Sequence, residues 1–148
     1  MSSFNYPCTP TYGAFDTGFV PVSPDANPAT FPTKRFQVTD HNPVWIHCKQ
    51  PGPPTHCGQG MVMAINPPTY GNTFDAFLAK AKAIGAAEAA SSSGYHPTST
   101  YGSQSTPYPP SGTYGAAATY TVAVGRDGLN FTPPIVNAKP GDYIDFTL

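Results

Sequence analysis

Several short stretches of the chain alternate apolar and polar residues with a period of two, as strands do when successive side chains point to opposite faces. The stretches that predict strands are 36–39, 44–48, 61–65, 119–124, 135–138 and 143–146, with a further short strand expected at 18–22. Prolines, glycines and polar turn residues separate these stretches. The pattern therefore predicts an all-β protein built from short strands.

One stretch departs from this alternation, because its apolar residues recur with a period of about 3.6. Asn72 or Thr73 is placed to cap the first turn of a helix. The apolar stripe of this helix consists of Phe74, Phe77, Leu78, Ala81 and Ile84. We therefore expect a single helix within residues 71–90, after the strand at 61–65, with its periodic part ending at Gly85.

Residues 91–118 have a different composition from the rest of the chain. They contain no Leu, Ile, Val or Phe and no Asp, Glu, Lys or Arg. A segment with so little to bury is expected to remain a flexible, disordered linker rich in Ser, Thr, Tyr, Gly and Pro. The segment after it, 119–148, holds only three expected strands and is too short to bury a core alone. It is expected either to dock on the first segment or to be a fragment of another domain.

The composition narrows the class of protein further. Charged residues make up 10% of the chain, against the ~25% of ordinary soluble domains, which argues against a helical bundle. Seven Lys and Arg residues leave no basic surface for nucleic acid, and no run of 18 apolar residues predicts a membrane span. The acidic residues show no paired-carboxylate pattern, so we expect no catalytic turnover: Asp16, Asp25, Asp75 and Glu88 are scattered.

Soft metal donors lie close together in the sequence. Cys48, His56, Cys57 and Met61 fall within 14 residues. Thiolate, imidazole and thioether are the donors that copper prefers, whereas the spacing suits zinc poorly because no second Cys-x-x-Cys pair exists. The residues alone leave two other interpretations open: Cys48 and Cys57 can form a disulfide that leaves Cys8 free, and Met61 can be a core residue.

Longer motifs around these donors resemble a known family. The stretches that carry the resemblance read PCTPTYGAFDTGF, FQVT, PVWIHCKQ and HCGQGMVMAINP, followed by TFDAFLAKA. They look like the C-terminal half of a fungal extracellular cupredoxin, a family of secreted, Ser-rich blue-copper proteins similar to plant phytocyanins. The last segment, TYTVAVGRDGLNFTPPIVNAKPGDYIDF, resembles the N-terminal half of the same fold.

The resemblance implies a cupredoxin-like Greek-key β-sandwich that binds one type 1 copper and transfers single electrons or holds copper outside the cell. It implies that Cys48 is the equatorial thiolate, His56 an equatorial imidazole and Met61 the axial ligand. It further implies a disulfide between Cys8 and Cys57. The family's second equatorial histidine follows the strand that ends here at 148, so this ligand is expected to be missing from the chain, as His41, His47 and His96 do not stand at that position.

The two halves stand in the reverse of the family's order. We therefore expect residues 1–70 to be the C-terminal half of one cupredoxin domain, 71–90 its helix, 91–118 a linker and 119–148 the N-terminal half of a second domain or permuted strands of the first. The sandwich would be incomplete or permuted accordingly. The expected partner is a redox partner or a cell-wall component. The alternative function is a metal-free structural or interaction module of the cell surface that has kept the fold.

Overall fold

The structure is a computed structural model of the 148-residue chain and describes residues 1–23, 25–91 and 116–148. The described residues form seven strands, one α-helix and a short 3₁₀ helix at Pro28–Thr30. In chain order the elements are β1 (Thr33–Gln37), β2 (Val44–His47), β3 (Val62–Ile65), α1 (Phe74–Ala90), β4 (Thr119–Val124), β5 (Phe131–Thr132), β6 (Ile135–Val136) and β7 (Tyr143–Thr147).

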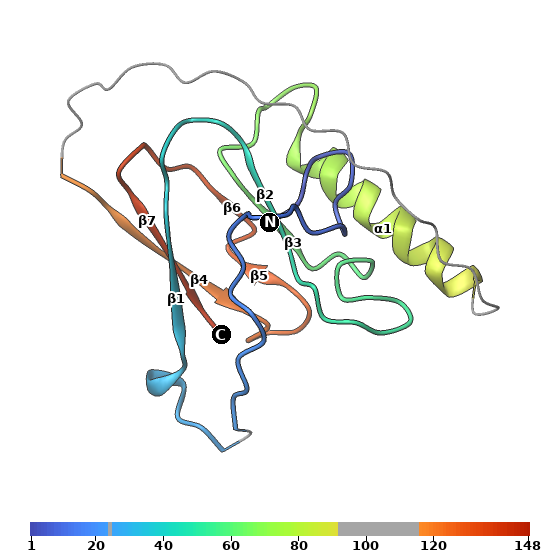
Figure 1. The fold of residues 1–148 in the computed structure, drawn as a ribbon, viewed down its shortest axis with the longest axis horizontal. Coiled ribbons are helices and arrows are strands. Elements are labelled where there is room, and N and C mark those ends of the chain that lie inside the picture. The colour runs from blue at the N-terminus through green and yellow to red at the C-terminus, as the bar shows by residue number, and fades with distance from the viewer. Residues whose placement is uncertain (24, 92–115) are drawn as a thin grey trace.

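The strands form two sheets, which confirms the expected β-sandwich with a single helix (Figure 1). One sheet has the order β1-β7-β4-β5, and the other has the order β2-β3-β6. The strand expected at 18–22 is wrong. Asp16 Oδ1 accepts a hydrogen bond from the backbone N–H of Gly18 at 2.7 Å, and Gly18 has a φ of +70°. The positive φ takes Gly18 out of the extended conformation, and none of residues 18–22 pairs with a strand.

A core of apolar side chains fills the space between the two sheets. Along strand β7, burial alternates from residue to residue: Ile144 and Phe146 are buried in this core, and their neighbours are half-buried. The core consists of Val38, Ile46, Met61, Met63, Ile65, Val122, Phe131, Val136, Ala138, Ile144 and Phe146. The sandwich therefore places the inward face of β2 and β3 against the larger sheet.

Helix α1 covers the other face of β2 and β3 (Figure 1). Its fully buried Phe77 packs on Trp45 of β2, with the ring centroids 4.7 Å apart. Phe74 and Ala81 join this second core. Because it is covered on both sides, strand β3 is buried at every residue, which explains its continuous apolar sequence.

The helix begins at the expected cap and ends within the expected bounds of 71–90. Thr73 is the cap, and its hydroxyl accepts a hydrogen bond from the N–H of Ala76 at 3.2 Å. The periodic pattern was expected to end at Gly85, but α1 continues to Ala90. Gly85 is buried inside the helix because the backbone of Gly58 packs directly against it. The glycine therefore serves a close approach and not a helix end.

Strands after residue 118 complete both sheets. Strand β7 pairs antiparallel with β1 and parallel with β4, while β6 pairs parallel with β3. Asn66 joins the same segments through its side chain: it donates to the carbonyl of Ala138 at 2.9 Å and accepts from the Ala138 N–H at 2.8 Å. Asn66 has a φ of +52°, a conformation that asparagine tolerates better than most residues. Most of the expected linker, 92–115, lies outside the described residues.

Candidate metal centre

The hairpin of β2 and β3 brings two of the sequence-predicted donors to the same end of the smaller sheet. Cys48 directly follows β2, and Met61 directly precedes β3. The N–H of Cys48 donates to the carbonyl of Met61 at 3.0 Å, so the strand pairing continues one step past the named strands. The intervening loop, 49–60, must therefore leave and return at neighbouring positions.

His56 and Cys57 lie in the returning part of this loop. The carbonyl of His56 accepts a hydrogen bond from the N–H of Met61 at 2.9 Å, and its own N–H donates to Gln50 at 3.2 Å. Cys57 forms a disulfide with Cys8, as the family resemblance implied, and Cys48 is a free cysteine. The open alternative of a Cys48–Cys57 bridge is thereby excluded. The disulfide ties the ligand loop to the N-terminal segment.

The thiol of Cys48 and the imidazole of His56 face one another. Cys48 Sγ lies 3.7 Å from His56 Nδ1, and both residues are half-buried. For comparison, a transition metal bound to one sulfur at ~2.3 Å and one nitrogen at ~2.0 Å in tetrahedral geometry separates them by about 3.5 Å. The spacing of this pair therefore fits donors that share one metal ion, and it also permits a weak thiol–imidazole hydrogen bond.

Met61, the expected axial ligand, is buried in the core between the sheets. Its terminal methyl lies 3.8 Å from the place where a Cβ on Gly125 would be. Through its backbone it contacts both Cys48 and His56. Among the His, Cys, Asp and Glu side chains of the described ranges, no group of three or more is arranged to hold a metal. The structure thus brings Cys48 and His56 together and places Met61 beside them in the backbone network.

Burial controls the protonation of two neighbouring groups. Desolvation raises the pKa of the Cys48 thiol, and this outweighs the lowering effect of a hydrogen bond from the Gln50 backbone. The thiol is therefore protonated at neutral pH, and a metal ion would have to displace that proton. Burial lowers the pKa of His47 to about 4. Its neutral ring is nine-tenths buried, and neither ring nitrogen has a hydrogen-bond partner among the described residues.

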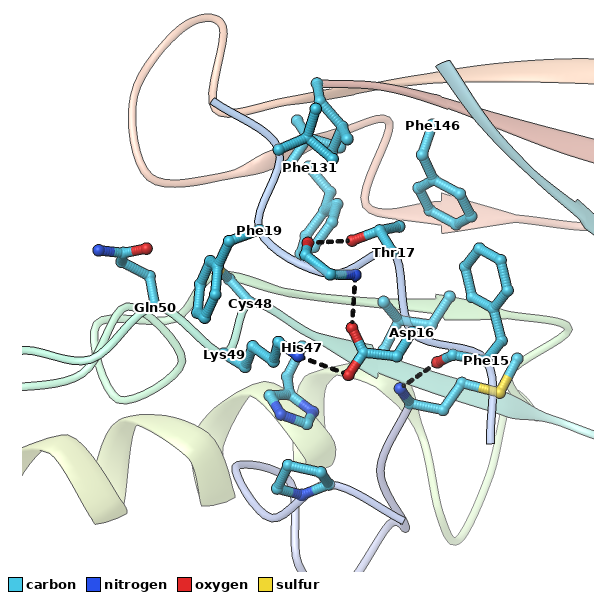
Figure 2. A pocket seen from close by; sticks show the side chains of 17 residues that line it. Phe15, Asp16, Thr17, Phe19, His47, Cys48, Lys49, Gln50, Phe131 and Phe146 are labelled. Atoms are coloured by element: carbon cyan, nitrogen blue, oxygen red, sulfur yellow. Dashed lines mark hydrogen bonds and ion pairs between the residues drawn. The ribbon is translucent and has the colours of Figure 1, made fainter. Parts of the chain in front are cut away.

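A cavity of about 190 Å³ opens beside Cys48. Figure 2 shows Phe19 and Cys48 on one side of it and Phe15 and Phe146 on the other. Aromatic and aliphatic side chains dominate its wall, and the charged groups lie at Asp16 and Lys49. The half-buried free thiol therefore borders a mainly apolar space.

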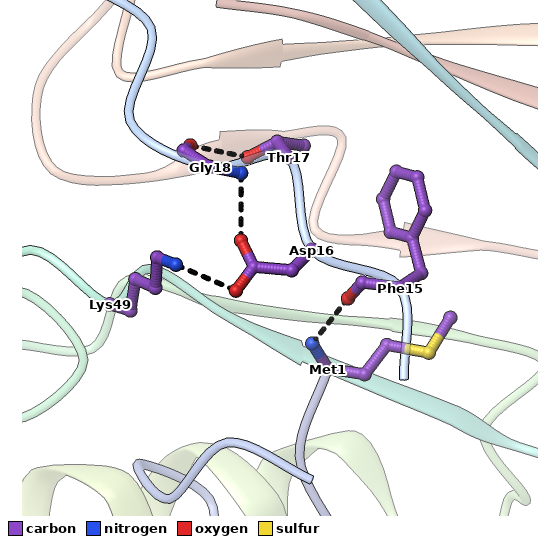
Figure 3. A network of polar contacts seen from close by, with 6 residues as sticks. All are labelled: Met1, Phe15, Asp16, Thr17, Gly18 and Lys49. Atoms are coloured by element: carbon purple, nitrogen blue, oxygen red, sulfur yellow. Dashed lines mark hydrogen bonds and ion pairs between the residues drawn. The ribbon is translucent and has the colours of Figure 1, made fainter. Parts of the chain in front are cut away.

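An ion pair spans the edge of this cavity. Lys49 Nζ lies 2.6 Å from Asp16 Oδ2, and Asp16 also accepts the Gly18 N–H (Figure 3). The hydrogen bond from Lys49 holds the pKa of the Asp16 carboxyl below its usual value. The N-terminal amine of Met1 donates to the Phe15 carbonyl at 2.9 Å in the same network. Sequence reasoning missed this pair, because 33 residues separate its members and no local pattern links them.

Comparison with known proteins supports the resemblance at moderate similarity. The chain is 30% identical over 88 residues to a protein from Arthroderma benhamiae described as "Probable GPI-anchored cupredoxin-1". This match covers 60% of the chain. The chain spans about two fifths (41%) of the length of that relative. No family model matches the chain, and no solved structure matches it. The two-sheet fold and this relative together support a cupredoxin-like protein.

Proposed function

We propose that Cys48, His56 and Met61 are three of the four ligands of a type 1 copper site, and that the protein transfers single electrons or holds copper without catalytic turnover. The observation that carries the proposal is the 3.7 Å separation of Cys48 Sγ and His56 Nδ1 at the end of the β2–β3 hairpin. The similarity to a relative that is named a cupredoxin supports it. Thiolate, imidazole and thioether together are a copper-selective donor set.

Several features of the chain restrict movement of the proposed ligands. Backbone hydrogen bonds join Cys48, Met61 and His56, and the Cys8–Cys57 disulfide anchors the residue next to His56. Copper bound there would supply a one-electron Cu(I)/Cu(II) couple. A donor set that moves little between the two oxidation states favours electron transfer, which is the reason for assigning this role to a constrained loop.

We propose an extracellular or cell-surface location. The relative is described as GPI-anchored, and a structural disulfide such as Cys8–Cys57 is typical of oxidising compartments. Within residues 1–23, 25–91 and 116–148, no helix has the length and apolar character to cross a membrane. The proposed partner is a redox protein or a component of the cell wall.

Titration with Cu(II) tests the copper proposal. We expect one equivalent to produce a thiolate-to-Cu(II) band in the visible spectrum, because copper would displace the proton of the Cys48 thiol into solvent. The band is expected to be weak, since Cys48, His56 and Met61 supply only three of the four ligands of a type 1 site. Cys48→Ser is expected to abolish the band completely, since a hydroxyl does not give this transition. His41→Gln, which changes an exposed histidine outside the site, is the control and is expected to keep it. A colourless wild-type protein at stoichiometric copper would instead support a metal-free surface module.

We further propose that residues 119–148 belong to the same folded unit as residues 1–70, as permuted strands. Three hydrogen bonds support this. The N–H of Ala64 donates to the carbonyl of Pro134, and the N–H of Asn66 donates to the carbonyl of Val136. The N–H of Ala138 donates to the side-chain oxygen of Asn66. We expect these three amides to exchange at least about a thousandfold more slowly than the amide of the exposed Tyr70. Hydrogen exchange followed by NMR measures this, and unprotected amides throughout 119–146 would contradict the proposal.

A further inference from the structure

A single carboxylate attaches the loop that carries His56 to the last turns of helix α1. Glu88 Oε2 accepts a hydrogen bond from the backbone N–H of Thr55 at 2.8 Å. The hydroxyl of Thr55 lies 3.0 Å from Oε2 and 3.2 Å from Oε1. Both residues are half-buried, and hydrogen bonds to an ionised carboxylate are among the stronger ones in proteins.

Thr55 extends this attachment to the turn that follows it. Its hydroxyl accepts a hydrogen bond from the N–H of Gly58 at 3.1 Å, and its carbonyl accepts one from the N–H of Gln59 at 2.9 Å. Thr55 and Gly58 flank His56 and Cys57. The position of the His56 backbone therefore depends on where Glu88 holds Thr55.

The backbones of the loop and the helix are in contact beside this carboxylate. A Cβ on Gly85 would lie 2.1 Å from the carbonyl oxygen of Gly58, and a Cβ on Gly58 would lie 2.8 Å from Glu88 Oε2. Leu78 and Lys82 of the same helix lie against Gly60. Helix positions 78, 82, 85 and 88 share one face, so this face of α1 carries the ligand loop along three turns.

The Glu88 carboxylate forms no ion pair within residues 1–23, 25–91 and 116–148. Helix α1 ends at Ala90, and a negative charge near a helix C-terminus is unfavourable. The hydrogen bonds to Thr55 are therefore the interactions that compensate for a carboxylate at this end of the helix.

We infer that Glu88 is a positioning residue for the metal centre, which acts through Thr55 to hold His56 beside Cys48. This inference rests on the copper site proposed above. It gives α1 a second role: one face covers the β2–β3 sheet, and the neighbouring face supports the ligand loop. Glu88 itself touches neither Cys48 nor His56 in this assignment.

Replacement of Glu88 tests the inference in the full chain. Glu88→Ala removes every acceptor for Thr55, and we expect Cu(II) affinity to fall about 10–100-fold, as for other residues that orient metal ligands, with a weaker thiolate-to-Cu(II) band. Glu88→Gln keeps one oxygen for the Thr55 N–H and is expected to restore most of both. Asp75→Ala is the matched control, because it removes a carboxylate from the first turn of the same helix. It is expected to bind copper as the wild type does.

A second measurement needs no metal. In the copper-free protein, Glu88→Ala is expected to speed hydrogen exchange at the Thr55 and Gly58 amides by about tenfold or more, whereas Asp75→Ala leaves both unchanged. If Glu88→Ala fails to unfold cooperatively, Thr55→Val and Thr55→Ser replace it, with only the former expected to weaken copper binding. Wild-type affinity in Glu88→Ala would overturn the inference, even with faster exchange. A wild-type protein that binds no Cu(II) would overturn the copper proposal, while the exchange result would still test whether Glu88 holds the loop.

Discussion

A Cys8→Ser, Cys57→Ser double variant is expected to unfold with a free energy about 4 kcal/mol lower than that of the wild type. The disulfide joins residues 49 positions apart. Closing a loop of this length removes chain entropy from the unfolded state, and the chain-entropy model gives about 4 kcal/mol for it. Because small domains have total stabilities of only about 5–15 kcal/mol, this bridge contributes a large part of the stability of the fold.

Urea unfolding of the copper-free proteins measures this loss. Reduction of the wild-type disulfide provides a second route to the same open chain without a substitution at the buried Cys57. Cys48→Ser is the matched control, since it makes the same chemical change at the free, half-buried thiol, and it is expected to cost less than about 1 kcal/mol. A loss below about 1 kcal/mol in both the double variant and the reduced protein would contradict the prediction.

Phe77→Ala is expected to lower the free energy of unfolding by about 3–5 kcal/mol, the usual cost of truncating a fully buried aromatic residue. Phe77 has no exposed surface and packs between Trp45 of β2 and Phe4 of the N-terminal segment. Its ring belongs to the core between α1 and the outer face of the smaller sheet. Truncation would leave a cavity there that the neighbouring rings fill only in part.

The adjacent residue offers a control for this effect. Leu78 is half-buried, so Leu78→Ala removes apolar side chain from the same helix turn and is expected to cost about 1 kcal/mol. Denaturant unfolding followed by the fluorescence of Trp45, the chain's one tryptophan, reports both values and the environment of the affected ring. Equal losses in the two variants would contradict this prediction.

Local pattern was sufficient to predict most of the elements. The alternation at 119–124 coincides with β4, and Thr73 caps the helix as expected. The two-residue strand β5 was not expected, because two residues are too few to show a period. The periodic part of the helix was expected to end at Gly85 because glycine commonly ends a helix, although the expected bounds of 71–90 agree with the end of α1 at Ala90. Only the contact with Gly58 reveals why a glycine lies inside the helix.

In the candidate site, too, some features were predictable from the sequence and others depend on tertiary contacts. The family resemblance implied the disulfide between Cys8 and Cys57, and the structure confirms it. The residues that surround the donors follow no sequence rule: Asp16 and Lys49, like Thr55 and Glu88, come together from positions 33 residues apart. Such pairs depend on how a loop folds back on a strand or a helix, and hydrophobic periodicity contains no information about that.

By itself, the sequence determined the all-β class, the single helix and the group of soft donors around the β2–β3 hairpin, because these follow from local periodicity and from residue type. The tertiary structure alone decided that β7 pairs between β1 and β4, that β3 is covered on both faces, and that Cys48 Sγ faces His56 Nδ1. Each of these features depends on contacts between residues distant in the chain. The physical reason is that burial and hydrogen bonding require two elements that pack together, whereas a sequence pattern describes the faces of one element only.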